Sequence, residues 1–349
     1  MAALAMMVTV PAAMAGGTAG AANAPPGHYA TRADVRAFAR EASQATGIPV
    51  ATIERTLGTA RYQAAIVALM DKPLLAPPKW FEYAPSFLDP ARVAAGVAFF
   101  DANAATLARA EALYGVPAGI IVAIVGVETY WGRITGRYRV LDALATLAFD
   151  YPRRAPFFRG ELTEFLALTH EEKLAPGSVL GSFAGATGLP QFMPGSYRRY
   201  AIDFDGDGRI DLWTNAADTI GSVANFLARH DWARGQPVLL PASIDAANRA
   251  ALDARLDGGL SERRALDAWR QDGLAVASLP ADLAPDPVGV LALEEGADAT
   301  SLWLACNNFY VITRYNRSRL YAAAVWKLAA AIDVARRDVV IPAKAGIQP

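Results

Sequence analysis

Cysteine, histidine and long apolar runs are scarce in this sequence. The single cysteine, Cys306, leaves no partner for an intramolecular disulfide and too few thiolates for a metal cage. The three histidines, His28, His170 and His230, are scattered along the chain. Zinc or another transition metal would therefore lack its usual ligands. These absences argue against a disulfide-stapled scaffold and against transition-metal chemistry.

No excess of charge of either sign is present. The 33 basic and 34 acidic residues give a formal net charge of −1, so nucleic acid is not an expected partner. Of the 349 residues, 53% are apolar and 19% charged, which predicts a folded protein with a large core. At about 150 residues per domain, the length suggests two domains or one large domain with an insertion.

The amino terminus lacks charge altogether. Residues 1–31 contain no Asp, Glu, Lys or Arg, and the small-x-small triplets Ala13–Ala15 and Ala22–Ala24 resemble cleavage sites. The apolar stretch is shorter than the roughly 20 residues of a spanning helix. Residues 1–30 are therefore interpreted as a signal-like leader, which predicts export to the periplasm. Because a basic n-region is missing, a flexible Ala/Gly-rich leader is the alternative.

Helical periodicity dominates the rest of the chain. Residues 31–114 are expected to form an α-helical N-terminal region, interrupted by an extended Pro-rich connection at 73–90. Residues 115–235 contain a helix that is apolar nearly all round, as expected of a central core helix. The prediction for this part of the chain is a mainly α fold built around that helix.

The amino-acid composition changes after residue 235. Residues 236–304 are rich in Pro and Asp and contain short β-prone pieces, which predicts a small α/β insertion. Residues 305–337 are expected to close the core, with a short strand at Tyr310–Tyr315 and a C-terminal helix from Ser318. Residues 338–349 are expected to be a disordered tail.

Glu128 is the acidic residue near the end of the apolar helix. A buried carboxyl group must be neutralised, paired or placed at a solvated site, and burial favours the protonated form that a general acid needs. An ion pair with Arg133 or Arg137 is the simpler alternative. Glu128 taken alone does not decide between them.

Long motifs surround Glu128 and recur along the chain. They read Gly126–Gly132 (GVETYWG), Leu141–Leu147 (LDALATL), Tyr151–Arg154 (YPRR), Gly181–Ala186 (GSFAGA), Gln191–Pro194 (QFMP), Gly221–Asn225 (GSVAN) and Asn308–Asn316 (NFYVITRYN). In this order, over residues 31–335, the chain resembles lytic murein transglycosylases, and more closely the membrane-bound lytic transglycosylase B family. The resemblance implies a lysozyme-like catalytic core of the goose-type/transglycosylase class within residues 115–235.

The resemblance also implies a reaction. The family cleaves the β-1,4 bond between N-acetylmuramic acid and N-acetylglucosamine in peptidoglycan without water, leaving 1,6-anhydromuramoyl ends. Glu128 matches its single catalytic acid/base. A hydrolytic muramidase would use a second carboxylate, which another part of the fold could supply. That muramidase and a non-catalytic peptidoglycan-binding protein remain the alternative functions.

Further site residues follow from the same motifs. The positions that line the saccharide groove in the family correspond here to Ser182, Gln191, Asn308, Tyr310 and Tyr315. Hydroxyls and amides bind sugar oxygens without the desolvation cost of a full charge. The alternative is that Ser182 and Asn308 stabilise turns or helix caps, and that the tyrosines pack in the core.

Residues 203–211 (DFDGDGRID) follow the pattern of an EF-hand-type calcium loop. The expected ligands are the side chains of Asp203, Asp205, Asp207 and Asp211 and the carbonyl of Arg209. Thr214 occupies the twelfth position, where glutamate is usual, and Asp218 is expected to complete the site, as in an EF-hand-like loop of the family. A solvated Asp/Gly turn is the alternative. The ion, Ca²⁺ or Na⁺ in its place, is expected to be structural, with no cofactor for catalysis.

The expected partners are peptidoglycan glycan strands and other cell-wall enzymes. We expect a monomer that is soluble or peripherally attached to the membrane, because no lipobox cysteine stands near the amino terminus.

Overall fold

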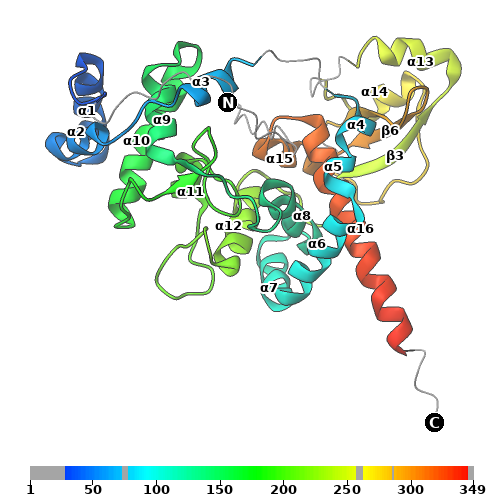
Figure 1. Ribbon diagram of the computed structural model, residues 1–349. Helices are drawn as coiled ribbons and strands as arrows, with labels where there is room; N and C mark the ends of the chain where they lie inside the picture. Colours follow the sequence, from blue (N-terminus) through cyan, green and yellow to red (C-terminus); the bar gives the residue numbers. More distant parts are fainter. Residues whose placement is uncertain (1–27, 73–77, 257–261, 285–286, 345–349) are drawn as a thin grey trace, which may run out of the picture. The chain divides into compact units, whose positions relative to one another are not determined.

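In the computed structural model the chain is described over residues 28–72, 78–256, 262–284 and 287–344, with side chains as far as 338. Helices make up most of these residues and strands form two small sheets (Figure 1). The prediction of a mainly α fold is confirmed. The expected leader, 1–30, lies almost entirely outside the described residues.

The chain divides into two compact units, each discontinuous in sequence. Of the described residues, one unit contains 28–72 and 128–222, and the other contains 78–127, 223–256, 262–284 and 287–344. We call them the Glu128 unit and the sheet unit, after the residue and the element that mark them. The expected N-terminal region, 31–114, is divided between the two.

Helices α9 and α10 form the centre of the Glu128 unit (Figure 1). The unit contains α1 (Ala33–Thr46), α2 (Val50–Gly58), α3 (Ala64–Met70), β1 (Tyr138–Arg139), α9 (Val140–Phe149), the 3₁₀ turn η1 (Pro152–Arg154), α10 (Ala155–Glu171), β2 (Leu180–Gly181) and α11 (Pro194–Tyr200). Every residue of α9 except Phe149 is buried, and α1 packs Val35 and Phe38 into the same apolar cluster. This cluster is the hydrophobic core of the unit.

Asp142 is a buried acid in that core. Its carboxylate accepts hydrogen bonds from the backbone N–H of Arg61, at 3.0 Å, and from the Arg139 guanidinium, at 3.3 Å. Burial raises the pKa of Asp142, while the Arg61 hydrogen bond and the Arg139 charge oppose that rise. The side chain therefore ties the segment between α2 and α3 to α9.

We expect Asp142→Ala to lower the free energy of unfolding by about 2–4 kcal/mol, because it leaves a backbone donor and a guanidinium without their acceptor. Urea unfolding of the full chain measures the change. Asp142→Asn, which keeps an acceptor oxygen, should cost clearly less. Equal losses in the two variants would contradict this role.

Helices and one four-stranded sheet build the sheet unit. Its elements are α4 (Trp80–Tyr83), α5 (Pro85–Leu88), α6 (Pro90–Ala102), α7 (Ala104–Tyr114), most of α8 (Ala118–Thr129), the C-terminal part of α12 (Ala216–Ala228) from Val223, β3 (Leu239–Ile244), α13 (Ala246–Asp253), α14 (Leu266–Gln271), β4 (Leu274–Val276), β5 (Gly289–Glu294), β6 (Thr300–Ala305), α15 (Asn307–Tyr315) and α16 (Arg319–Lys344). The strand order is β4-β3-β6-β5, with every neighbouring pair antiparallel. The small sheet expected in residues 236–304 is therefore present.

The insertion has an apolar cluster of its own. Leu252 of α13, Trp269 of α14 and Leu302 and Leu304 of β6 are buried together. The indole N–H of Trp269 donates to the carbonyl of Val288 at 2.9 Å, so its polar atom is satisfied inside the cluster. The sheet and its two short helices thus pack as one module.

Three expectations about local structure were wrong. Tyr310–Tyr315 belongs to helix α15, because Phe309, Ile312 and Tyr315 recur at helical spacing on its buried side. Helix α16 continues to Lys344, so residues 338–344 are helical where a disordered tail was expected. The Pro-rich connection contains α4 and α5, with Pro85 at the first position of α5, where a missing N–H costs nothing.

Among the described helices, none is by itself long and apolar enough to cross a membrane; α7 and α8 meet that measure only as a pair, bent by 113°.

Candidate active site

Helix α8 positions Glu128. All twelve residues of Ala118–Thr129 are buried, and the first ten are apolar or glycine. Glu128 is 3% exposed and occupies the last turn. Arg133 and Arg137 are exposed, and neither forms an ion pair with any residue of the described chain. An ion pair between Glu128 and Arg133 or Arg137 is therefore not the arrangement observed.

The turn after α8 is held in an unusual conformation. Tyr130, Trp131 and Gly132 have φ values of 52°, 52° and 89° in succession. A positive φ is costly for a side chain with Cβ and persists only where the surroundings enforce it. Here Thr129 does so, since its hydroxyl donates to the carbonyl of Leu189 at 2.8 Å and accepts from the N–H of Gly132 at 3.1 Å.

The Thr129 bond connects the end of α8 to the loop that carries Gln191. Gln191 also has a positive φ, of 50°, and its amide Nε2 donates to the carbonyls of Thr135, at 3.1 Å, and Gly188, at 2.9 Å. Within the described chain its Oε1 accepts no hydrogen bond. The loop thus fixes the Gln191 side chain and leaves one acceptor available.

Ser182 lies just beyond strand β2 in the same unit. Its Oγ accepts the backbone N–H of Ala184, at 3.3 Å, and of Ala186, at 3.0 Å, which leaves the hydroxyl hydrogen available for another acceptor. Gly136 packs so closely here that an added Cβ would lie 2.1 Å from the carbonyl oxygen of Gly181. The segment after α8, Ser182 and Gln191 are therefore fastened together.

Thr129 was missed by the sequence reasoning, although it stands next to Glu128. We expect Thr129→Val to lower the free energy of unfolding by about 1–3 kcal/mol, because the carbonyl of Leu189 and the N–H of Gly132 lose their partner. We also expect a lower kcat. Thr129→Ser keeps the hydroxyl and should restore both Tm and kcat. If valine and serine behaved alike, the hydroxyl would not be the cause.

Asn308 lies in the sheet unit, and its side-chain amide is hydrogen-bonded to the backbone. Its Oδ1 accepts the N–H of Ala233, and its Nδ2 donates to the carbonyls of Ala233 and Gln236, each at 2.8 Å. The side chain is fully buried. In this arrangement Asn308 holds the backbone of the segment after α12.

The two tyrosines of α15 are also packed into the sheet unit. The hydroxyl of Tyr310 lies against Gly289, and the guanidinium of Arg263 lies 4.4 Å from its ring centroid. Burial raises the pKa of Tyr310 to about 12. Tyr315 is 8% exposed and packs edge-on against Phe226, with ring centroids 4.8 Å apart. Both rings contribute to packing, and Tyr310 keeps part of its surface exposed.

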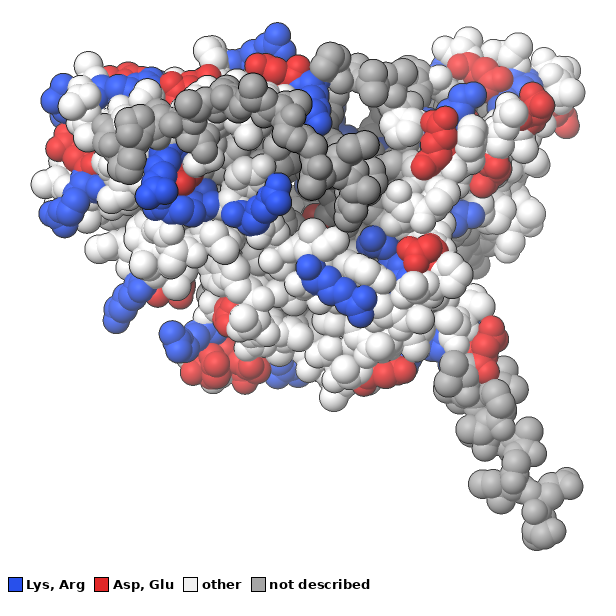
Figure 2. Space-filling view, viewed as in Figure 1, with Lys and Arg blue, Asp and Glu red and all other residues white. Residues whose placement is uncertain are grey.

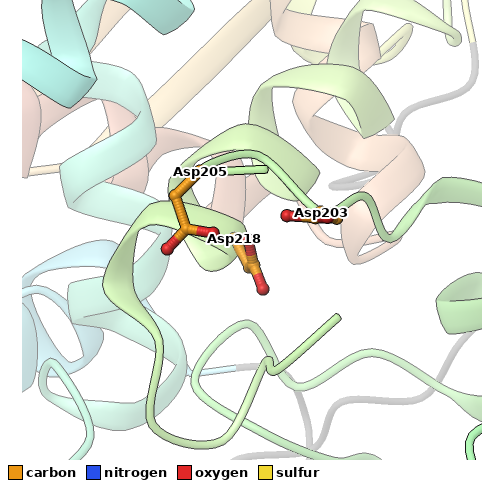
Figure 3. Close-up of side chains that lie close together, drawn as sticks. All are labelled: Asp203, Asp205 and Asp218. Carbon is orange, nitrogen blue, oxygen red and sulfur yellow. The ribbon is translucent and has the colours of Figure 1, made fainter. Parts of the chain in front are cut away.

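The acidic loop brings three of its expected ligands together. Carboxylate oxygens of Asp203, Asp205 and Asp218 all lie within 4.8 Å of one another. Figure 3 shows the two loop residues close to Asp218, which belongs to α12. Such a set of oxygen donors fits a hard cation. Asp218 is fully buried and accepts the N–H groups of Phe204 and Asp211, each at 2.8 Å.

Other expected ligands of the loop are placed differently. Burial would raise the pKa of Asp211, but the Thr214 hydroxyl and the N–H groups of Thr214, at 2.9 Å, and Trp213, at 2.8 Å, donate to its carboxylate and hold that pKa below the usual range. Asp207 accepts the N–H of Arg209 at 2.9 Å. Neither carboxylate belongs to the group of three. Asp211 thus caps the following turn, and Asp218 supplies the carboxylate from the helix.

Comparison with known proteins places the chain in a family. The model of the family described as Transglycosylase SLT domain matches residues 30–330. Membrane-bound lytic murein transglycosylase B of Escherichia coli (strain K12) is 39% identical over 325 residues, which are 89% of this chain and 85% of that protein.

Solved structures give the same result. The catenated lytic transglycosylase SltB1 of Pseudomonas aeruginosa has a TM-score of 0.83 and 43% identity, covering 88% of this chain and 99% of its own. The Escherichia coli lytic transglycosylase Slt35, solved in complex with calcium, has a TM-score of 0.80 and 38% identity, covering 89% and 96%. The chain therefore belongs to the lytic murein transglycosylases, enzymes that cleave peptidoglycan, as its motifs indicated.

Proposed function

We propose that this lytic transglycosylase uses Glu128 as its single acid and base. Protonated Glu128 gives its proton to the oxygen between N-acetylmuramic acid and N-acetylglucosamine as the bond from that oxygen to C1 breaks. The resulting carboxylate takes the proton of the muramoyl C6 hydroxyl as that oxygen bonds to C1. The product is a 1,6-anhydromuramoyl end, and Glu128 regains its proton.

The observation that carries this proposal is a nearly buried carboxyl group at the end of an apolar helix. Such surroundings favour the protonated form at neutral pH. Four other buried or half-buried acids of the same unit have structural partners: Asp142 with Arg61 and Arg139, Asp150 with Arg32 and Tyr29, Glu161 with the N–H of Gly195, and Asp218 with the N–H groups of Phe204 and Asp211. A single-carboxylate reaction suits this arrangement.

For substrate binding we propose direct contacts from Ser182, as a donor, and Gln191, as an acceptor. Both keep an unused hydrogen-bonding atom within the described chain. Tyr310 and Tyr315 are proposed to contribute aromatic surface to the saccharide site. We assign Asn308 a structural role. It lies on α15 with these tyrosines, after the insertion, and holds the backbone of Ala233 and Gln236, before the insertion.

We propose that Ca²⁺, or Na⁺ in its place, binds to Asp203, Asp205 and Asp218, with Asp207 and the carbonyl of Arg209 completing the shell. The ion stabilises the loop and takes no part in the reaction. The enzyme is further proposed to act as a periplasmic monomer on glycan strands, alone or with other cell-wall enzymes.

Digestion of bare peptidoglycan sacculi followed by mass spectrometry tests the proposed reaction. Anhydromuramoyl products weigh 18 mass units less than hydrolysis products. We expect anhydro ends to dominate. Reducing ends would identify a muramidase, and intact sacculi with bound, folded protein would identify a wall-binding protein.

A further inference from the structure

The end of the acidic loop is hydrogen-bonded to the segment that carries Gln191. The carbonyl of Leu212 accepts the N–H of Leu189 at 2.7 Å. The carbonyl of Ile210 accepts the hydroxyl of Tyr197, also at 2.7 Å. Leu189 stands two positions before Gln191, and Tyr197 belongs to α11, which begins three positions after Gln191. The loop therefore holds this segment on both sides of Gln191.

Leu212 and Gly188 fit together so closely that only glycine is accommodated. Gly188 has a φ of 70°, and an added Cβ would lie 2.4 Å from the Leu212 carbonyl oxygen. The carbonyl of Gly188 accepts a hydrogen bond from Nε2 of Gln191 at 2.9 Å, so this glycine also holds the amide side chain. Leu189 and Leu212 are buried, and packed interiors transmit displacements between neighbours. A shift of Leu212 therefore moves the support of Gln191.

Asp218 connects Leu212 to the proposed cation site. Its Oδ2 accepts the N–H of Asp211, the residue before Leu212, at 2.8 Å. Its carboxylate is also one of the three, with those of Asp203 and Asp205, whose oxygens lie within 4.8 Å of one another (Figure 3). These like charges repel one another unless a cation lies between them. The spacing of the carboxylates, and with it the placement of Asp211, therefore depends on the cation.

The outer side of the acidic loop is open to solvent. Figure 2 shows acidic side chains gathered where the chain runs between α11 and α12, as Figure 1 locates it. Residues 205–209 are exposed, whereas Asp218 is fully buried. A cation that enters from solvent thus acts on a carboxylate inside the unit.

We propose that a cation bound at the acidic loop strengthens saccharide binding by Gln191, and that the Leu212–Leu189 hydrogen bond couples the two sites. This inference rests on the proposed function. The effect is one of positioning, because a Gln191 side chain already held in place loses less freedom when the saccharide binds. Since coupling between two sites is reciprocal, bound saccharide must strengthen cation binding by the same factor.

Calorimetric titration of the full chain, in calcium and in EDTA, tests the coupling. The ligand is the disaccharide N-acetylglucosamine-β-1,4-N-acetylmuramic acid, which lacks the bond that the proposed reaction cleaves and therefore binds without turnover. We expect calcium to strengthen disaccharide binding about tenfold, and saturating disaccharide to lower the Kd for calcium by the same factor. Equal affinities in the two buffers, or no binding in either, would overturn the coupling.

Two glycine variants test the Leu212–Leu189 bond. Gly188→Ala forces a Cβ against the Leu212 carbonyl, whereas Gly47→Ala adds a Cβ at a similar φ of 74° with no atom within 4 Å. Both should keep the rise in Tm with calcium. We expect Gly188→Ala to bind the disaccharide equally weakly with and without calcium, and Gly47→Ala to keep the wild-type difference. A Gly188→Ala protein that kept this difference would contradict the proposed link.

Tyr197→Phe tests the second bond with a milder change, and it replaces Gly188→Ala if that variant does not fold. The ring remains, and only the hydroxyl that donates to the carbonyl of Ile210 is lost. We expect the effect of calcium on disaccharide binding to fall to about threefold, as the loss of one hydrogen bond of typical strength allows. An undiminished effect would contradict the transmission of the cation's influence through this contact.

The proposed reaction and the coupling can fail separately. A wild type whose disaccharide affinity follows calcium but which releases no anhydro product from sacculi would refute the proposed reaction and leave the coupling standing. Anhydro product from a wild type whose disaccharide affinity ignores calcium would do the reverse.

Discussion

Glu128→Gln should lower the rate of anhydro product release by at least about 10³-fold. General acid and general base steps are each worth roughly 10²–10⁴-fold, and here one residue performs both. The amide keeps the shape of the side chain but cannot deliver a proton, so binding of glycan and the Tm should stay close to those of the wild type. Mass spectrometry of released muropeptides and a thermal scan provide the two measurements.

A matched control exists in the same unit. Glu161 of α10 is half-buried, burial raises its pKa, and its carboxylate accepts the N–H of Gly195 at 2.9 Å. In Glu161→Gln the amide oxygen can accept the same bond, so most activity should remain. Activity retained in Glu128→Gln, or lost equally in both variants, would remove Glu128 from the role of acid and base.

Calcium should raise the Tm by roughly 5–10 °C. An ion present at 100 times its Kd stabilises the folded state by about 2.7 kcal/mol, and a domain of 150–250 residues gains about 2–4 °C per kcal/mol. The physical cause is the cluster of three carboxylates, whose mutual repulsion the cation relieves. Differential scanning calorimetry with calcium and with a chelator measures the difference.

Asp205→Asn separates ion binding from folding. Asp205 is exposed, in contrast to Asp218, so its replacement should leave the calcium-free Tm near that of the wild type and abolish the response to calcium. Asp267→Asn, at an exposed acid of α14, is the control for loss of one charge. A wild-type Tm that ignores calcium, or an undiminished response in Asp205→Asn, would defeat the assignment.

Periodicity and motifs predicted the elements that depend on short stretches of chain. The apolar helix that carries Glu128 in its last turn, the sheet of the insertion and the acidic loop could all be predicted, because each has a local pattern. The segment Tyr310–Tyr315 could not, since its β-branched residues favour a strand and the burial of Phe309, Ile312 and Tyr315 along one helical side outweighs that preference.

Contacts between residues far apart in the sequence could not be predicted from such local patterns. The hydroxyl of Thr129 meets the carbonyl of Leu189, 60 positions away, and the amide of Asn308 meets Ala233, 75 positions away. Nothing in the sequence around Asn308 distinguishes a sugar ligand from a backbone clamp, because both need a buried amide. The left-handed backbone of Tyr130 and Trp131 has one counterpart in the sequence, the glycine that follows them.

The insertion begins and ends with neighbouring strands, β3 and β6. Leu239 of β3 is paired with Ala305 of β6, and the N–H of Cys306 donates to the carbonyl of Val238 at 3.1 Å. Because the two ends meet and the free energy of closing a loop grows only slowly with its length, this stretch can be lengthened, shortened or exchanged at little cost to what surrounds it. Evolution can therefore rework this stretch while the polypeptide around Glu128 keeps its chemistry.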